Sequence, residues 1–217
     1  LYMQELNMFF KGKLDLAIQI FKNEYHKNFL HQLVSSQLDV DRLDYLRRDS
    51  FYTGVSEGVI GSDRILKMLN VVNDQLVVEA KGIYSIEKFL IARWLMYWQV
   101  YLHKTVVSAE QLLLMIFKRV KYLLLNNEQI FLPESLQYFY TNKQKKGLSE
   151  MLENYALIDD TDIFTCIKNW TLERDKVLAL LSKRLLNRQL FRVEIQNTPF
   201  DEKKIKELTK KASKVLN

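Results

Sequence analysis

Residues 37–49 read Q-L-D-V-D-R-L-D-Y-L-R-R-D, and they crowd three aspartates and an arginine into the six positions Asp39–Asp44. A helix turns by about 100° per residue, so Asp41 and Tyr45 would share one stripe of it, while Leu46 would lie on the opposite side. The stretch therefore predicts a helix that has one face for a hydrophobic core and another face for chemistry.

The same residues allow a plainer interpretation. Asp44 and Arg48 lie four positions apart, a spacing that stabilises a solvent-exposed helix by about 0.2–0.5 kcal/mol. On that interpretation the helix carries surface charges and no site.

A resemblance favours the site. The pattern D-x-D-R-L-D-Y-L-x-R-D, followed by Tyr52-Thr53-Gly54, resembles the third metal-ligand motif of HD-domain phosphohydrolases and is most similar to the deoxynucleoside triphosphate triphosphohydrolase branch. The similarity runs from about Phe29 to Gly54 and recurs in Y-L-H-K at residues 101–104. The family's upstream pattern, a His followed later by a His-Asp pair, is missing, because none of the three histidines precedes an Asp. Since the chain starts at Leu1 without an initiator Met, we expect the missing pair upstream.

Composition predicts a mainly α protein. Apolar residues make up 48% of the chain, which suffices for a sizeable core, and six glycines with two prolines are too few for an all-β fold. With the resemblance, we expect a multi-helix HD-domain-like bundle. Two β-branched runs around Asn73-Asp74 predict a small β-hairpin at about 67–80, and the alternation at 190–195 predicts a short C-terminal strand.

Apolar periodicity places the helices. They are expected at about 14–21, 25–34, 38–49, 63–69, 86–104, 108–125, 149–155, 161–170 and 173–186, with a last helix after Thr198-Pro199. Ser35 and Ser36 are the expected N-caps of the helix that starts near Leu38. The helix at 86–104 is apolar almost all round, which predicts burial or a subunit contact.

The organisation expected from these patterns is a catalytic part at 1–142 and a helical subdomain at 143–217, separated by a polar break. A net charge of +6 and a pI near 9.2 favour a polyanionic partner, either a nucleotide or nucleic acid, although lysines gathered between Lys203 and Lys214 account for part of the excess. The single Cys166 indicates a reducing compartment, so we predict a cytoplasmic protein. No apolar run is long enough to span a membrane, so we expect no membrane contact. The apolar helix at 86–104 favours a homo-oligomer.

The resemblance implies a divalent metal. Asp41 matches the last ligand of a site built from two His and two Asp, and a carboxylate with imidazoles suits Mn, Fe, Ni, Mg or Zn. His26 and His31 match no ligand. The plain alternative for Asp41 is a solvated helix residue.

The resemblance also implies a substrate site. Arg42 matches a phosphate contact, Asp49 an acceptor for the 3′-hydroxyl, and Tyr45 a ring that stacks on the ribose and selects deoxy forms. Further matches near the phosphates and base are Arg93, Tyr101, His103 and Lys104. The alternatives are an ion pair with Asp39 for Arg42, core packing for the tyrosines, and solvent for Lys104.

The implied activity is metal-dependent hydrolysis of (deoxy)nucleoside phosphates, releasing nucleoside and triphosphate in the triphosphohydrolase branch. Because one recognisable ligand does not make a catalytic metal site, we expect the 217 residues alone to be inactive. The alternative functions are a nonenzymatic helical module that binds nucleic acid or a partner protein through basic faces, and a degenerate relative that only binds nucleotide.

Overall fold

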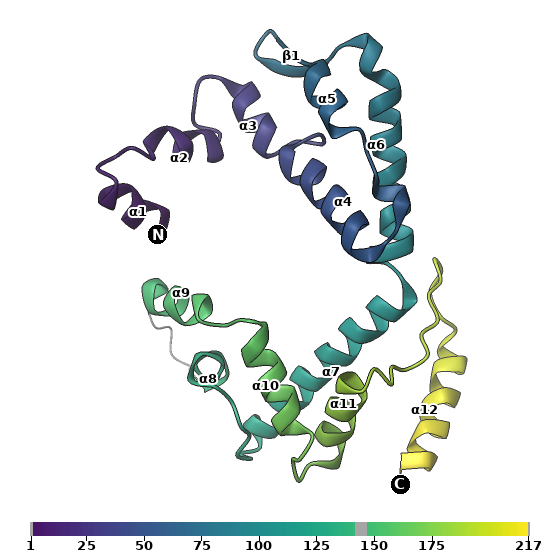
Figure 1. The fold of residues 1–217 in the computed structure, drawn as a ribbon. Helices are drawn as coiled ribbons and strands as arrows, with labels where there is room; N and C mark the ends of the chain where they lie inside the picture. Colours follow the sequence, from purple (N-terminus) through teal and green to yellow (C-terminus); the bar gives the residue numbers. More distant parts are fainter. Residues whose placement is uncertain (1, 142–146, 217) are drawn as a thin grey trace. The chain divides into compact units, whose positions relative to one another are not determined.

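The computed structural model describes residues 2–141 and 147–216, and these are mainly helical (Figure 1). The helices are α1 (Tyr2–Phe9), α2 (Asp15–Phe21), α3 (Asn28–Val34), α4 (Val40–Thr53), α5 (Ser62–Met68), α6 (Ile83–Met96), α7 (Lys104–Leu125), α8 (Glu134–Thr141), α9 (Leu148–Ala156), α10 (Asp160–Trp170), α11 (Lys176–Leu186) and α12 (Glu202–Leu216). The mainly α prediction is confirmed.

The chain divides into two compact units. Unit 1 comprises Leu1–His103 and Leu132–Phe164, and unit 2 comprises Lys104–Phe131 and Thr165–Asn217. The boundary predicted between residues 142 and 143 lies outside the described residues and stays a prediction. Among the described residues no single helix has both the length and the apolar composition of a membrane span, and only residues 80–101 and 104–125, taken together across a break, reach them.

Helix α4 begins later than its sequence suggested. Its N-cap is Asp39, whose Oδ1 accepts a hydrogen bond from the Arg42 backbone N–H at 2.8 Å, so the prediction of Ser35 or Ser36 as the cap was wrong. Ser36 instead accepts a bond from the Leu38 N–H at 3.2 Å and shapes the turn before the helix. At the other end Gly54 stops α4 with φ of +71°, a left-handed conformation that glycine adopts without strain.

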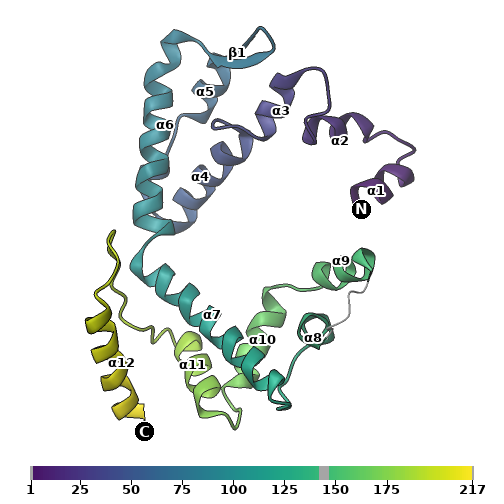
Figure 2. The ribbon, with the colours of Figure 1, turned by 180° about the vertical axis from the view of Figure 1, so that it is seen from behind.

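The predicted hairpin is confirmed. Strands β1 (Leu69–Val72) and β2 (Gln75–Val78) pair antiparallel, with Val72 opposite Gln75 across the two-residue turn. Asn73 and Asp74 have φ of +50° and +60°, as a primed turn requires. The Asp74 carboxylate accepts the N–H of Asn28 at 2.8 Å, which ties the turn to α3. The hairpin accordingly lies beside α3 (Figure 2).

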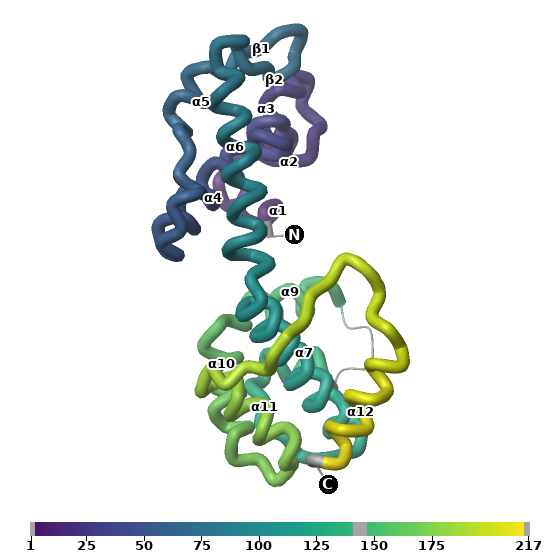
Figure 3. Tube along the Cα trace, turned by 90° about the vertical axis from the view of Figure 1, so that its right-hand side faces the viewer, coloured from purple at the N-terminus to yellow at the C-terminus, as the bar shows by residue number. Residues whose placement is uncertain are grey.

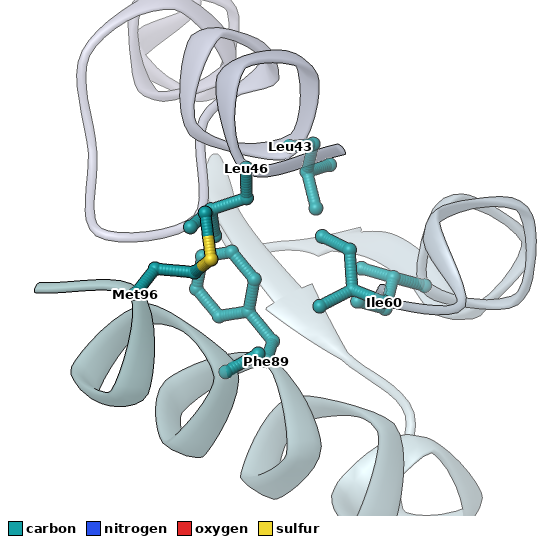
Figure 4. Close-up of a cluster of buried hydrophobic side chains, with 7 residues drawn as sticks. Leu43, Leu46, Ile60, Phe89 and Met96 are labelled. Atoms are coloured by element: carbon teal, nitrogen blue, oxygen red, sulfur yellow. The ribbon is translucent and has the colours of Figure 1, made fainter. Parts of the chain in front are cut away.

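The core of unit 1 fills the space between α4, α5 and α6 (Figure 4). Its buried members are Leu43, Leu46, Ile60, Ile65, Phe89, Ala92 and Met96. The backbone at Gly58 packs tightly against α4 and α6. A Cβ at that position would clash, since it would lie 2.8 Å from the Ser50 Cβ and 2.9 Å from the Met96 Sδ. The apolar side of α4 is thus fixed against α6, and its polar side remains available for a site.

The range predicted as one regular helix at 86–104 is α6 followed by a π turn, and it is less buried than predicted. Regular α6 ends at Met96, Tyr97–Tyr101 form one wide π turn in which the Leu102 N–H donates to the Tyr97 carbonyl at 2.7 Å, and α7 starts at Lys104. Within the described residues only one side of α6 is covered, and Trp94 on another side is 61% exposed. An apolar helix surface does not by itself determine which neighbour covers it.

Unit 2 is organised around α7 and α11, which lie side by side (Figure 3). Phe117 of α7 meets the ring of Trp170 edge to face at 5.9 Å between centroids. The strand predicted at 190–195 was wrong, because this extended segment pairs with no strand among the residues that the structure describes. It is held by a side chain, since the buried Ser108 hydroxyl donates to the Phe191 carbonyl at 2.8 Å.

Candidate functional site

The polar face of α4 and the last turns of α6 form a pocket of about 410 Å³ in unit 1. Its lining residues are Asp41, Arg42, Tyr45, Asp49, Arg93, Tyr97 and Tyr101. Asp41, Tyr45 and Asp49 line the pocket together because positions four apart lie above one another on a helix. The π turn contributes Tyr97 and Tyr101, and α6 contributes Arg93.

A direct hydrogen bond joins the two walls of the pocket. The Tyr101 hydroxyl donates to the Asp49 carboxylate at 2.6 Å, across 52 positions of sequence. Burial raises the pKa of Tyr101 above its ordinary value of 10.0, and the bond to Asp49 raises it further, so the phenol remains a proton donor at neutral pH. The Asp49 carboxylate keeps lone pairs for a second donor, such as a hydroxyl group.

Aromatic rings make up much of the pocket surface. Tyr101 lies edge to face with Tyr45 at 6.2 Å and with Tyr97 at 5.1 Å between centroids. Burial also raises the pKa of Tyr45, while the positive charge of Arg93 works in the opposite direction. Sequence reasoning missed Tyr97, although its position four residues after Arg93 and four before Tyr101 could have indicated it.

The two arginines of the pocket are each held by a neighbouring side chain. The Arg93 guanidinium donates to the Gln37 amide oxygen at 3.2 Å and lies 5.9 Å from the centroid of the Tyr97 ring. Arg42 pairs with Asp39, the partner named in the plain interpretation, but Asp39 is only 2% exposed. The pair is therefore a buried one that reaches the pocket, and Arg42 both pairs with Asp39 and lines the pocket.

Asp41 and Asp44 separate the two interpretations of α4. Asp44 pairs with Arg48 in solvent at 2.8 Å, as the plain interpretation expected of that spacing. Asp41 is exposed and lines the pocket. The acidic residues of α4 thus fall on two faces, one paired in solvent and the other lining the pocket.

The described residues do not fit a complete divalent metal site. No group of three or more His, Cys, Asp or Glu side chains within residues 2–141 and 147–216 could hold an ion together. His31 uses its Nδ1 in a hydrogen-bonding contact with the Ile20 carbonyl at 2.9 Å. From this part of the chain, Asp41 could supply one ligand.

The remaining predicted substrate residues, His103 and Lys104, do not line this pocket. His103 follows the π turn at the end of unit 1. Lys104 begins α7 and lines a separate pocket of about 500 Å³ in unit 2, together with Ser108, Arg188 and Arg192. The structure therefore brings together the predicted residues from Asp41 to Tyr101 and leaves these two outside the group.

A family model and a solved structure are both similar to this chain. Residues 60–138 match a family model described as the HD associated region. A crystal structure of a phosphohydrolase from Bacteroides thetaiotaomicron is 53% identical and superposes with a TM-score of 0.94 over 99% of this chain. The chain covers 54% of that protein, about half of its length.

Two curated sequences extend the comparison. The uncharacterized protein YwfO of Bacillus subtilis is 38% identical over 177 residues, which are 82% of this chain and 40% of YwfO. A deoxynucleoside triphosphate triphosphohydrolase SAMHD1 homolog of Dictyostelium discoideum is 34% identical over 85 residues, which are 38% of this chain and 16% of that protein. The similarity is thus broad for the first protein and local for the second.

Proposed function

Because this chain belongs to an HD-domain phosphohydrolase-like family, we propose that it contributes the nucleotide-binding part of a metal-dependent enzyme that hydrolyses deoxynucleoside triphosphates. One observation carries the proposal: a single pocket combines two guanidinium groups, a carboxylate bonded to a phenol, and three tyrosine rings. These are the groups that phosphates, a sugar hydroxyl and a nucleoside would need.

The roles follow from the chemistry of each group. Arg42 and Arg93 bind phosphate oxygens, because a planar guanidinium makes paired, charge-assisted hydrogen bonds to them. Asp49 accepts a hydrogen bond from the 3′-hydroxyl, and Tyr101 holds that carboxylate in place through its bond of 2.6 Å. The ring of Tyr45, which lies on the same stripe of α4, packs against the deoxyribose.

Asp41 would be one ligand of the metal, with the other ligands supplied from outside the described residues. A bound divalent ion would stabilise charge on the phosphates and provide an activated water. The contribution of this chain's own residues is to bind and orient the substrate beside that position. Arg42, next to Asp41 in the sequence, would hold the phosphates there.

The test compares two carboxylates on one helix in the full-length protein. Triphosphate release from each of the four common deoxynucleoside triphosphates is measured with Mn²⁺, for Asp49→Asn and for the control Asp44→Asn. Asp44 is 66% exposed and pairs only with Arg48 among the described residues. A site that loses its partner for a substrate hydroxyl is expected to lose about 100-fold or more in kcat/KM, whereas the control should stay within about twofold. Equal effects of the two changes, or no metal-dependent release from the wild-type protein, would reject the proposal.

A second candidate function rests on α12. Its residues 202–214 are exposed, and they include Lys203, Lys206 and Lys210. Such a face would bind nucleic acid through phosphate contacts that weaken steeply with salt. Single-stranded DNA binding that falls steeply with added salt and is lost when these lysines become glutamines would support it.

Assembly and location belong to the same proposal. The exposed Ile91 and Trp94 on α6 and Trp98 in the π turn would be covered in a homo-oligomer. The single buried Cys166 agrees with a cytoplasmic location.

A further inference from the structure

Asp39 divides its two carboxylate oxygens between two tasks. Oδ1 accepts the Arg42 backbone N–H at 2.8 Å, which caps α4. Oδ2 accepts the Ser36 N–H at 3.3 Å and also the guanidinium of Arg42. One buried side chain therefore fixes both the backbone and the charged end of the same arginine.

The guanidinium of Arg42 is only partly used by these contacts. Its Nη1 donates to Asp39 and to the Ser36 carbonyl at 2.6 Å. Within the described residues, no hydrogen bond is found for its Nε or Nη2. The side chain lines the pocket and is 27% exposed. The arginine is thus held by one nitrogen and can offer the others to a ligand.

Arg42 pairs with one of several carboxylates near it. The pocket contains two more carboxylates, Asp41 and Asp49, and an unrestrained arginine would be drawn to either of them. The ion pair found for Arg42 is the one with Asp39. Because Asp39 is buried and cannot be hydrated, the pair is costly to break, since separation would leave an unpaired charge in the interior.

We propose that Asp39 is a positioning residue for phosphate recognition, which holds the Arg42 guanidinium in the pocket and keeps it off Asp41 and Asp49. The proposal rests on the function proposed above for Arg42. It assigns Asp39 no contact with substrate. Its effect on the substrate should pass entirely through Arg42.

The substitution Asp39→Asn separates the two tasks. Asparagine caps helices about as well as aspartate, so its Oδ1 can keep the bond to the Arg42 N–H. Its NH₂ group, in the place of Oδ2, cannot accept from the guanidinium. The helix should therefore remain while the restraint on Arg42 is lost.

A matched control exists in unit 2. Asp175 caps α11 by accepting the Leu178 N–H at 2.7 Å and pairs with Arg119 at 2.6 Å, but that arginine lines no part of the pocket. Asp175→Asn thus removes a capping carboxylate and an arginine pair without touching the proposed site.

The experiment is a double-mutant cycle in the full-length protein with Asp39→Asn, Arg42→Ala and both together. Kinetics are measured with the best of the four common deoxynucleoside triphosphates. For Asp39→Asn we expect KM to rise about tenfold with kcat within about threefold, the scale of one charge-assisted hydrogen bond. In the Arg42→Ala background the same change should add nothing, and Asp175→Asn should leave KM unchanged.

Two probes without a complete substrate sharpen the result. Calorimetric binding of inorganic tripolyphosphate should weaken about tenfold in Asp39→Asn, whereas binding of the free deoxynucleoside should not change. A general disturbance of α4 would weaken both, because Tyr45 and Asp49 lie on the same helix.

Each outcome has one meaning. If Arg42→Ala weakens tripolyphosphate binding but Asp39→Asn does not, or if the effect of Asp39→Asn persists without Arg42, the positioning role is wrong and the proposed function stands. If Arg42→Ala changes neither KM nor tripolyphosphate binding, the phosphate role of Arg42 fails, and the inference fails with it.

Discussion

Two helices of this protein begin with an aspartate that also pairs with an arginine, and the two pairs differ in where the arginine comes from. Asp39 pairs with Arg42 of the helix that it caps, and that guanidinium reaches a pocket. Asp175 caps α11 but pairs with Arg119 of α7, which donates from Nε at 3.0 Å and from Nη2 at 2.6 Å. The same two residue types can therefore orient a side chain for a ligand or tie two helices together.

The electrostatics of the second pair support a structural role. The bond from Arg119 lowers the pKa of Asp175 below its ordinary value of 3.8, and the pKa of Arg119 is raised for the same reason. Both oxygens of the carboxylate are used by the paired guanidinium, and one of them also caps the helix. Arg42 is bound through Nη1 alone among the described residues, which is the difference that leaves it available.

The largest effect that would sharpen this contrast is expected at Asp41. In the full-length protein Asp41→Ala should abolish metal retention and lower turnover by more than the roughly 10- to 100-fold that loss of an outer-shell partner costs. The helix should persist, since alanine favours helix. Elemental analysis and circular dichroism test this, with Asp44→Ala as the control on the exposed side of α4. Full metal content in Asp41→Ala would show that this end of α4 is not at the metal.

The second effect concerns stability rather than turnover. Asp175→Ala removes a helix cap and leaves Arg119 without its carboxylate, so the free energy of unfolding should fall by about 2–4 kcal/mol. KM should not change. Urea unfolding followed by circular dichroism, together with steady-state kinetics, measures both quantities. A raised KM with normal stability would remove the distinction drawn between the two pairs.

A smaller effect is expected where the two walls of the pocket meet. Tyr101→Phe removes the hydroxyl that donates to Asp49, and kcat/KM should fall about tenfold, because the carboxylate loses the bond that orients it. Tyr122→Phe, on exposed α7 surface in unit 2, is the control. If Tyr101→Phe behaves like the control, the bond to Asp49 has no role in substrate binding.

The smallest effect is a pH dependence of stability. A carboxyl whose pKa is lowered in the folded state adds stability above its unfolded pKa and loses that stability as pH falls through the folded pKa. The contribution of Asp175 should therefore be complete near neutral pH and decline below about pH 4, from its ordinary value of 3.8 downward. Unfolding of wild type and Asp175→Asn between pH 2 and 7 should converge at the acid end. A constant difference across this range would mean that the charge of Asp175 contributes nothing.

Local patterns determined how much of the fold could be predicted. The hairpin followed from Asn73-Asp74 because a two-residue primed turn has strict demands. The start of α4 was misplaced because Ser36 and Asp39 are both good caps, and burial of Asp39 decides between them. The π turn after Met96 was missed because no glycine or proline marks the change from the α-helix. The segment at 190–195 alternates like a strand, but no pattern within a segment supplies its partner.

The candidate site was predictable along α4 and less so across the fold. Asp41 and Tyr45 share a stripe by periodicity, and Asp49 and Tyr101 were named as substrate residues only through the resemblance. Tyr97 was indicated neither by the periodicity of α4 nor by the resemblance. The pairing of Arg42 with Asp39 was anticipated as a surface contact, but its burial depends on tertiary packing that spacing does not reveal.

The π turn at Tyr97–Tyr101 sets the rotational phase of the pocket wall. Eight residues separate Arg93 from Tyr101, and in a regular α-helix they would turn about 800°, leaving the two side chains about 80° apart. A wide turn behaves as one inserted residue, and the remaining seven turn about 700°, only about 20° short of two full turns. If the same residues formed a regular α-helix instead, Tyr101 would lie about 80° out of phase with Arg93 while every amino acid of the site was still present. The hydrogen-bonding pattern of this turn, as much as its amino acids, therefore determines whether the site residues face one another.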